Sequence, residues 1–210
     1  MIPIPPGRAS RLRRRPGRMG RAVIGLAGGA LMVAGCAAAL DPRPDEVPAA
    51  ERLALLNAGK PRVEEPAQFV PMLVSEVLAL PRFAGRVTRD DLAAMAALEA
   101  RGVTVTGYIA TVFEAGDGDF HIQLTEAPPG RCLRGGGTNQ LVTELTPSIQ
   151  ARKPAYAFAR LFALCGQATP VRISGWLLND WPHQDESWRG TPWEVHPVTR
   201  IEVCCWQEMR

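Results

Sequence analysis

Residues 103–124 read VTVTGYIATVFEAGDGDFHIQL, and this stretch decides the fold. Between residues 103 and 111, the side chains alternate in a period of two, which predicts a half-buried strand. Residues 116–119, Gly-Asp-Gly-Asp, supply the positive φ that a tight hairpin turn needs. Apolar and polar residues then alternate through 120–124, so we expect a second, antiparallel strand.

The pattern continues toward the C-terminus with more strands and one helix. Three stretches have strand character: residues 141–145, 171–178 and 193–204. Thr146 and Pro147 open a helix, with a capping residue and a proline at its first position; Pro154 should kink it and Gly166 should end it. Three strands, one helix and two strands are the order of an OB-fold, a partly open Greek-key barrel. A strand-rich sandwich is the competing arrangement, but a single helix between strands three and four suits the barrel better.

The residues before the barrel have helical composition. Residues 49–59 and 67–80 predict short helices, interrupted by prolines. Thr88 can cap a further helix whose first turn carries two acids, where the helix dipole favours them. The sequence therefore predicts a mainly β protein: a five-stranded OB-like barrel over residues 102–205, preceded by a short helical segment over residues 49–101.

The N-terminus has the pattern of an export signal. Residues 1–35 contain seven arginines and no acid, and residues 22–35 carry no charge. This run is shorter than the roughly 20 residues that a transmembrane helix needs, and its flanks are typical of a signal peptide. Residues 33–36, Val-Ala-Gly-Cys, resemble the lipobox of bacterial lipoproteins. The resemblance implies cleavage before Cys36 and acylation of its thiol by chains such as palmitate; an ordinary secretory signal with an incidental cysteine is the alternative.

Cleavage would leave a domain tethered to a membrane through the lipidated Cys36. Residues 36–48 contain three prolines among small and charged residues, which is typical of a tether. By resemblance to Gram-negative sorting, Ala37 favours the outer membrane, on its periplasmic side. Removing seven arginines from 24 basic residues leaves 17 against 21 acids, a net charge of −4. The net charge of +3 of the whole chain therefore belongs to the export signal and does not indicate nucleic-acid binding.

Four cysteines remain in the mature chain: Cys132, Cys165, Cys204 and Cys205. An exported protein meets an oxidising compartment, so we expect at least one disulfide. Cys132 or Cys165 should be a member, because both lie where loops can adjust. The sequence alone does not choose among the three full pairings, and the spacing matches no zinc site.

The polar candidates for a functional site lie on the predicted second and last strands. A period of two places Asp119 and His121 on one strand face, and Glu194 and His196 on one face of the last strand. If the apolar residues between them point inward, both histidines face outward, where they can converge on a groove.

Imidazole and carboxylate groups together bind a divalent metal or share a proton in acid–base catalysis. A structural hydrogen-bond network is the third reading of the same residues. The catalytic candidates are His121, Glu194 and His196. The predicted ligand-binding set is larger, with Trp188 as a stacking aromatic: Asp119, His121, His183, Trp188, Glu194 and His196. Beyond a possible divalent metal, the sequence implies no cofactor.

Four segments carry a resemblance to known domains: residues 118–122, 142–144, 180–183 and 193–198. They resemble a family of poorly characterised bacterial OB-like domains. These share an acidic-x-His segment on the second strand and a Trp-Glu-(Ile or Val)-His-Pro-Val segment on the last. The resemblance covers about half of the chain and implies the barrel fold without implying a settled activity.

Two functions are compatible with these patterns. We favour a lipid-anchored, non-enzymatic module whose OB-like barrel binds a small ligand or an envelope protein. The alternative is a metal-assisted hydrolase of a phosphate ester or nucleic acid that uses the His/Glu cluster.

Overall fold

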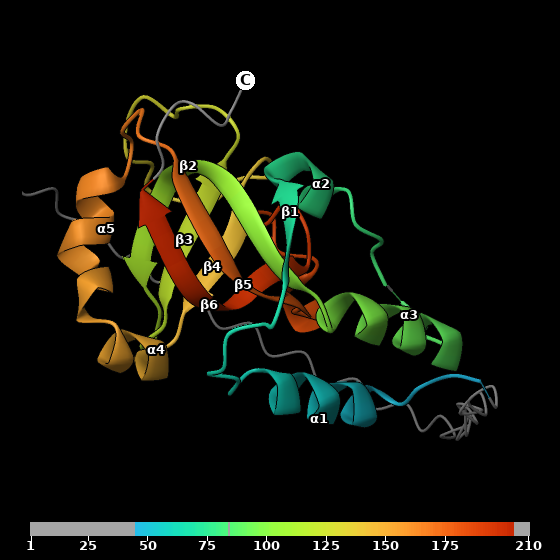
Figure 1. The fold of residues 1–210 in the computed structure, drawn as a ribbon. Coiled ribbons are helices and arrows are strands. Elements are labelled where there is room, and N and C mark those ends of the chain that lie inside the picture. The colour runs from blue at the N-terminus through green and yellow to red at the C-terminus, as the bar shows by residue number, and fades with distance from the viewer. Residues whose placement is uncertain (1–44, 84, 204–210) are drawn as a thin grey trace, which may run out of the picture. The chain divides into compact units, whose positions relative to one another are not determined.

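A closed five-stranded barrel forms the centre of the described part of the chain (Figure 1). The computed structural model describes residues 45–83 and 85–203. The barrel strands are β2 (Gly102–Glu114), β3 (Phe120–Thr125), β4 (Leu141–Leu145), β5 (Val171–Asn179) and β6 (Trp193–Val203). The predicted mainly β fold with a five-stranded OB-like barrel is confirmed.

The strand order closes the barrel as β2-β3-β4-β6-β5, with β5 pairing back onto β2. β4 and β6 pair in parallel at Thr143 and Val195, whereas the other barrel pairs are antiparallel. This Greek-key arrangement places the β2–β3 turn and the β5–β6 loop at the edges of the same barrel face. Such a face and its loops are the usual binding surface of an OB-fold.

Alternating side chains fill the barrel as the sequence predicts. Ile122 on β3 and Trp193 and Val195 on β6 are fully buried in one hydrophobic core. Gly118 in the β2–β3 turn has a φ of 88°, which explains the glycine there. The closed barrel and its core lie within a compact unit formed by residues 41–210. A compact unit with its own hydrophobic core is expected to fold on its own.

The helix expected over residues 67–80 is wrong in its first half. Phe69–Leu73 form a strand, β1, which pairs in parallel with β2, and only Val74–Leu78 are helical, as α2. Pro71 lacks an N–H group and is tolerated in a strand at a sheet edge. Among the described strands, β1 pairs with β2 only, so it lies at such an edge.

Two helices form where the sequence predicts them. α1 spans Ala49–Gly59 and α3 spans Arg89–Glu99. The Thr88 hydroxyl caps α3 by accepting a hydrogen bond from the backbone N–H of Asp91 at 3.1 Å. No helix among residues 45–83 and 85–203 is long and apolar enough to cross a membrane.

The helical connection between β4 and β5 is broken at Pro154 rather than kinked. α4 (Pro147–Arg152) and α5 (Phe158–Leu164) flank a 3₁₀ turn, η1 (Pro154–Tyr156). The Thr146 side chain makes no capping hydrogen bond, which corrects its expected role.

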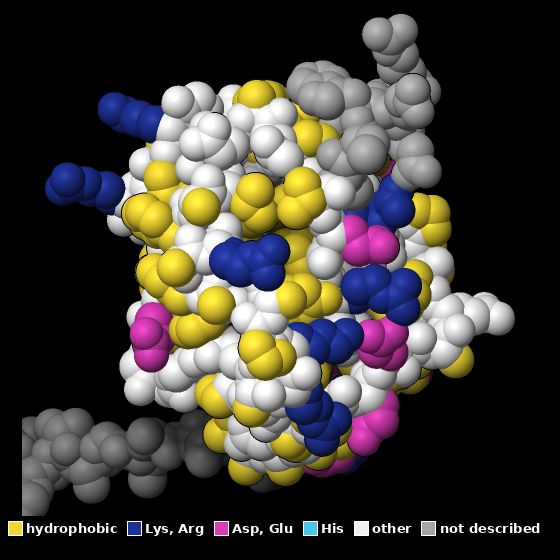
Figure 2. All heavy atoms as spheres, turned by 60° about the vertical axis from the view of Figure 1, so that its left-hand side comes forward, with side chains coloured by type: hydrophobic (Ala, Val, Ile, Leu, Met, Phe, Trp, Pro, Cys, Tyr) yellow, Lys and Arg dark blue, Asp and Glu magenta, His cyan; other side chains and the backbone are white. Residues whose placement is uncertain are grey.

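On the side turned forward in Figure 2, hydrophobic side chains lie among Lys and Arg side chains.

A disulfide between Cys132 and Cys165 joins the β3–β4 loop to the end of α5. It confirms the expectation that one of these two cysteines takes part in a bridge. Cys36, Cys204 and Cys205 lie outside the described residues.

Candidate functional site

The β5–β6 loop covers the outer face of β3, β4 and β6. It contains the 3₁₀ turn η2 (Trp181–His183) and places Arg189 at hydrogen-bond distance from Glu194. Under this loop Glu194 is 0% and His196 3% exposed. The alternation that turns these side chains away from the core is confirmed. His196 therefore does not reach a groove, because the loop covers it, whereas His121 lines the cavity described below.

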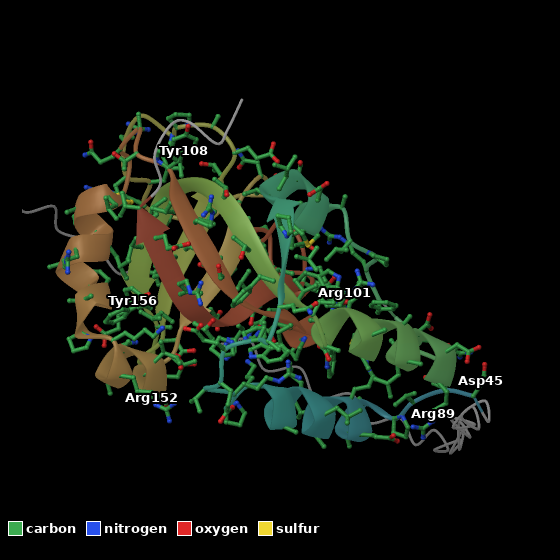
Figure 3. All side chains as sticks on the ribbon, viewed as in Figure 1. Asp45, Arg89, Arg101, Tyr108, Arg152 and Tyr156 are labelled. Carbon is green, nitrogen blue, oxygen red and sulfur yellow. A yellow bond between two sulfur atoms is a disulfide. The ribbon has the colours of Figure 1, made fainter. Side chains whose placement is uncertain are left out.

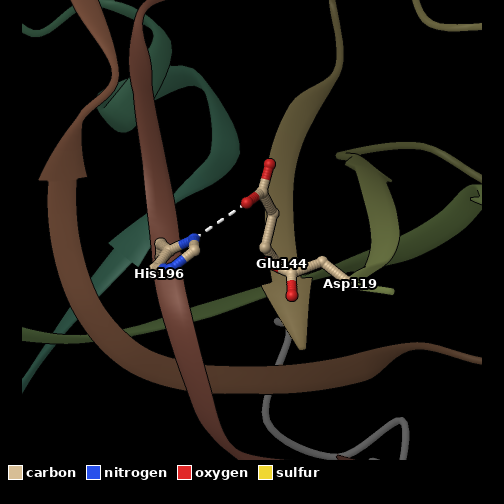
Figure 4. Close-up of side chains that lie close together, drawn as sticks. All are labelled: Asp119, Glu144 and His196. Carbon is tan, nitrogen blue, oxygen red and sulfur yellow. Dashed lines mark hydrogen bonds and ion pairs between the residues drawn. The ribbon is translucent and has the colours of Figure 1, made fainter. Parts of the chain in front are cut away.

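Glu144 on β4 joins the two histidines of this face. Its Oε2 accepts a hydrogen bond from Nδ1 of His196 at 2.8 Å (Figure 4). Its Oε1 lies 3.2 Å from Nε2 of His121 and 3.5 Å from Nη2 of Arg189. Because Glu144 pairs with His121 in the β3–β4 register, its role depends on a strand pairing that the sequence did not give. The sequence placed Glu144 in a family-like segment but not among the site residues.

Arg189 is the second residue that the sequence analysis missed. Its Nη1 lies 2.9 Å from Oε2 of Glu194, and its Nη2 lies 3.2 Å from Oδ2 of Asp180. The same Asp180 oxygen hydrogen-bonds Nδ1 of His183 at 2.7 Å. Arg189 has no local sequence signal as a site residue, because its partners come from β4, β6 and the far end of its own loop.

The buried charges shift one another's pKa. Burial disfavours the protonated form of His196, but hydrogen bonds to Glu144 and Glu194 outweigh it and raise the pKa of His196 to about 10. Burial likewise opposes ionisation of Glu144, but its bond to His196 and the nearby cations lower its pKa. His196 is therefore an imidazolium at neutral pH, paired with ionised Glu144.

A cavity of about 240 Å³ opens over this network. Three of the predicted ligand-binding residues line it: His121, His183 and Trp188. The other three, Asp119, Glu194 and His196, are buried residues that do not line its wall. The structure thus divides the predicted set into a cavity wall and a buried support.

The wall of this acidic cavity carries more acids than Lys and Arg. Among the described lining residues the acids are Asp117, Glu144, Asp180 and Glu186, and the cations are Lys60 and Arg189. Lys60 Nζ lies 3.8 Å from Oδ1 of Asp180, beyond hydrogen-bond range. Within the described part of the chain, neither that oxygen nor Nδ1 of His121 has a hydrogen-bond partner. The cavity therefore offers unused polar atoms in an acidic setting.

Three buried side chains have the chemistry and spacing of a metal site. Asp119, Glu144 and His196 each offer one ligand atom, and these atoms lie within 4.8 Å of one another (Figure 4). Burial raises the pKa of Asp119, with Asp117 and Glu144 adding to this and His196 opposing it. Of the three catalytic candidates, only His196 belongs to this group. Its other two members are Asp119 and Glu144, not His121 and Glu194.

The described tryptophans do not form a common stacking surface. Trp193 lies in the core and donates its indole N–H to the carbonyl of Pro81. Trp181 lies under the guanidinium of Arg52, away from the acidic cavity. Among the described tryptophans, Trp188 alone lines that cavity.

No protein-family model and no curated protein matches the sequence. Solved structures with some likeness include OBody AM3L15 bound to hen egg-white lysozyme, at 15% identity and a TM-score of 0.33, over 50% of this chain and 80% of that chain. OBody AM3L09 bound to the same lysozyme gives 15% identity and a TM-score of 0.33, over 51% and 84%. A protein described as an aspartyl-tRNA synthetase, from Leishmania major Friedlin, gives 12% identity and a TM-score of 0.33, over 71% of this chain and 25% of that chain.

Proposed function

We propose that this chain is an exported, membrane-tethered binding protein whose barrel holds a small organic cation in the acidic cavity. The observation that carries this proposal is the excess of carboxylates over Lys and Arg in the cavity wall. The cavity lies between the β2–β3 turn and the β5–β6 loop, where OB-folds bind their ligands. The location of the cavity is only an analogy between folds. We therefore infer the class of ligand from the charge of the cavity wall.

The size and charge of the cavity restrict this ligand. Its volume of about 240 Å³ is below the roughly 300–1,000 Å³ of pockets for drug-sized molecules. A phosphate or nucleic-acid strand would meet like charge from Asp117, Asp180 and Glu186. Lys60, 35% exposed at its side chain, already places an ammonium group near Asp180. An organic ammonium ligand would take the place of that group.

Calorimetric titration of residues 41–210 with putrescine, a small diammonium compound, tests this proposal. Lys60→Ala removes the resident cation and should strengthen binding by roughly threefold to tenfold, as expected for about 1 kcal/mol of Coulomb energy at 4 Å in water. Glu186→Gln should weaken it by a similar factor. Lys153→Ala and Asp185→Asn, which alter residues outside the cavity wall, are the matched controls. Absence of saturable binding, or equal effects of variants and controls, would rule the proposal out.

The membrane tether is a separate part of the proposal. Cys36 lies outside the described residues, so its support is the lipobox-like sequence. Cys36→Ser should abolish acylation and move the chain out of the membrane fraction, because a single thiol carries the proposed anchor. Fractionation of cells that express both forms checks this, and unchanged membrane partitioning would contradict it.

A metal-assisted hydrolase is a second candidate because Asp119, Glu144 and His196 converge. A metal ligand must be deprotonated, and the proton that His196 holds with a pKa of about 10 opposes metal binding at neutral pH. Near-stoichiometric metal after dialysis, with hydrolysis of bis-p-nitrophenyl phosphate that Asp119→Asn abolishes, would establish the hydrolase; metal-free, inactive protein would remove it.

A further inference from the structure

A second cavity lies between α1 and α3, which run side by side (Figure 1). Residues of both helices line it, together with Asn179 at the end of β5 and Trp181 in η2. Its volume is about 550 Å³, within the range typical of small-molecule sites. The two cavities share no described lining residue.

The helix walls of this α1–α3 cavity are apolar. Leu55 and Leu56 line it from α1, and Leu92, Met95 and Ala96 line it from α3. Leu55 is 50% exposed, which leaves apolar surface uncovered where the helices face each other. An alkyl chain is the kind of group that such walls bind.

Three residues that line the cavity carry buried polar groups without a partner in the described part of the chain. In residues 45–83 and 85–203, no hydrogen-bond partner is present for Nε of Arg52, Nε1 of Trp181 or the side-chain amide of Asn179. Asn179 is 1% and Arg52 7% exposed. Buried polar groups are normally hydrogen-bonded, and an unpaired one costs stability. Each of these three side chains has an N–H donor, so together they suit an acceptor on a ligand.

The charges around the cavity favour an anion. Arg62 lines it in addition to Arg52, against one described acid, Glu99. Arg89 also lines it, but Glu51 balances its charge. Arg89 reaches from α3 to Glu51 on α1 (Figure 3), while Arg62 donates to the carbonyl of Glu99 at 3.0 Å. Burial also raises the pKa of Glu99, which weakens its opposition to an anion.

We propose that the α1–α3 cavity binds a free single-chain amphiphile with an anionic head, the chemistry of a fatty-acid carboxylate. The head accepts hydrogen bonds from Arg52, Asn179 and Trp181, and the chain lies along the leucine and alanine side chains of the two helices. This site is independent of the cation-binding function, because it uses different residues and a ligand of opposite charge.

Calorimetry of residues 41–210 with monomeric dodecanoate tests this inference. We expect saturable binding of one molecule per domain. Decanoate, two methylenes shorter, should bind about 15-fold more weakly, since each buried methylene is worth about fourfold in affinity. Dodecyltrimethylammonium of the same chain length should bind at least tenfold more weakly. Equal binding of the cationic amphiphile, or association only with phosphatidylglycerol vesicles, would overturn the proposal.

Two variants of α3 locate the site. Ala96 lines the cavity and Ala97 does not, and both are exposed. Ala96→Trp should fill the cavity and lower dodecanoate affinity at least tenfold, whereas Ala97→Trp should leave it unchanged. Circular dichroism checks that both variants are folded. If Ala96→Trp fails to fold, Asn179→Leu removes the amide at the head-group end and should cause the same loss. Normal affinity in a folded Ala96→Trp or Asn179→Leu variant would overturn the proposal.

Discussion

The acidic cavity and the α1–α3 cavity differ in how far their buried polar groups are paired. Around the acidic cavity, Glu144, Glu194 and Asp180 each contact Arg189, and His196 bonds Glu144. At the α1–α3 cavity, the described part of the chain supplies no partner for the amide of Asn179. A paired network can hold a fold together whether or not a ligand binds above it. Within the described residues, both cavities also contain buried groups without a hydrogen-bond partner, Oδ1 of Asp180 and Nδ1 of His121 at the first and the amide of Asn179 at the second. Such groups cost stability unless a ligand completes them.

The largest expected difference between the regions concerns their buried arginines. Arg189→Met leaves Glu144, Asp180 and Glu194 without their shared cation, and breaking a buried ion pair costs roughly 3–5 kcal/mol. Among the described residues Arg52 has no carboxylate partner; it donates to the carbonyl of Phe83 and stacks on Trp181. Arg52→Met should therefore cost about 1–2 kcal/mol, less than Arg189→Met. Thermal unfolding compares them; equal losses would mean that the networks do not differ as described.

The next effect tests the network at His196. His196→Ala strands the carboxylate of Glu144, and losing one member of a buried hydrogen-bonded pair costs about 1–3 kcal/mol. Denaturant unfolding at neutral pH measures this loss. Glu194→Gln, which keeps the shape of the side chain, is the companion variant. A His196→Ala protein as stable as the wild type would show that this network is not structural.

Stability should also depend on pH through His196. In the unfolded chain a histidine loses its proton near pH 6.5, whereas folded His196 keeps it up to about pH 10. The folded state therefore binds one more proton between these values. Its stabilising contribution is complete below pH 6.5 and is lost as the pH rises toward 10. Chemical unfolding at several pH values should show this loss of stability in the wild type and a smaller loss in His196→Ala.

A smaller effect of opposite sign is expected at Asn179. Asn179→Leu replaces an unsatisfied buried amide by an apolar side chain of similar size, so the ligand-free domain should gain about 1 kcal/mol. Added dodecanoate should stabilise the wild type but not this variant. Differential scanning calorimetry with and without dodecanoate measures both, and a destabilised variant would show that the amide is satisfied in solution.

The smallest effect concerns the N-cap of α3, which carries one wall of the α1–α3 cavity. Thr88→Ala removes the hydrogen bond to Asp91 and should cost about 1 kcal/mol. Thr146→Ala is the control, because the Thr146 hydroxyl makes no capping bond. Chemical denaturation should separate the two variants; a larger loss in Thr146→Ala would reverse the assignment of the caps.

The barrel was predictable because apolar and polar residues alternate locally along its strands. The strand at residues 141–145 agrees with β4 residue for residue. β1 was missed because Pro71 and helical composition hide a strand whose partner, β2, lies some thirty residues further along the chain. The candidate site was predictable only in part. The period of two correctly places Glu194 and His196 on one face of the strand, but it does not predict the residues that cover this face.

The sequence did not predict which residues cover that strand face. Arg189 and Glu144 become site residues through the fold of the β5–β6 loop and the β3–β4 register, which are long-range properties. The sequence did not predict the α1–α3 cavity for the same reason. Its head-group residues, Arg52, Asn179 and Trp181, come from three elements, and none has a motif that predicts their meeting.

The most direct measurement crosses the two proposed ligands with one variant of each cavity. Putrescine and dodecanoate are titrated calorimetrically into wild-type residues 41–210 and into Glu186→Gln and Ala96→Trp. The account predicts that Glu186→Gln weakens only putrescine binding and that Ala96→Trp weakens only dodecanoate binding. Putrescine binding that Glu186→Gln leaves unchanged, or that Ala96→Trp alters as strongly, would contradict the claim that the acidic cavity is the cation site.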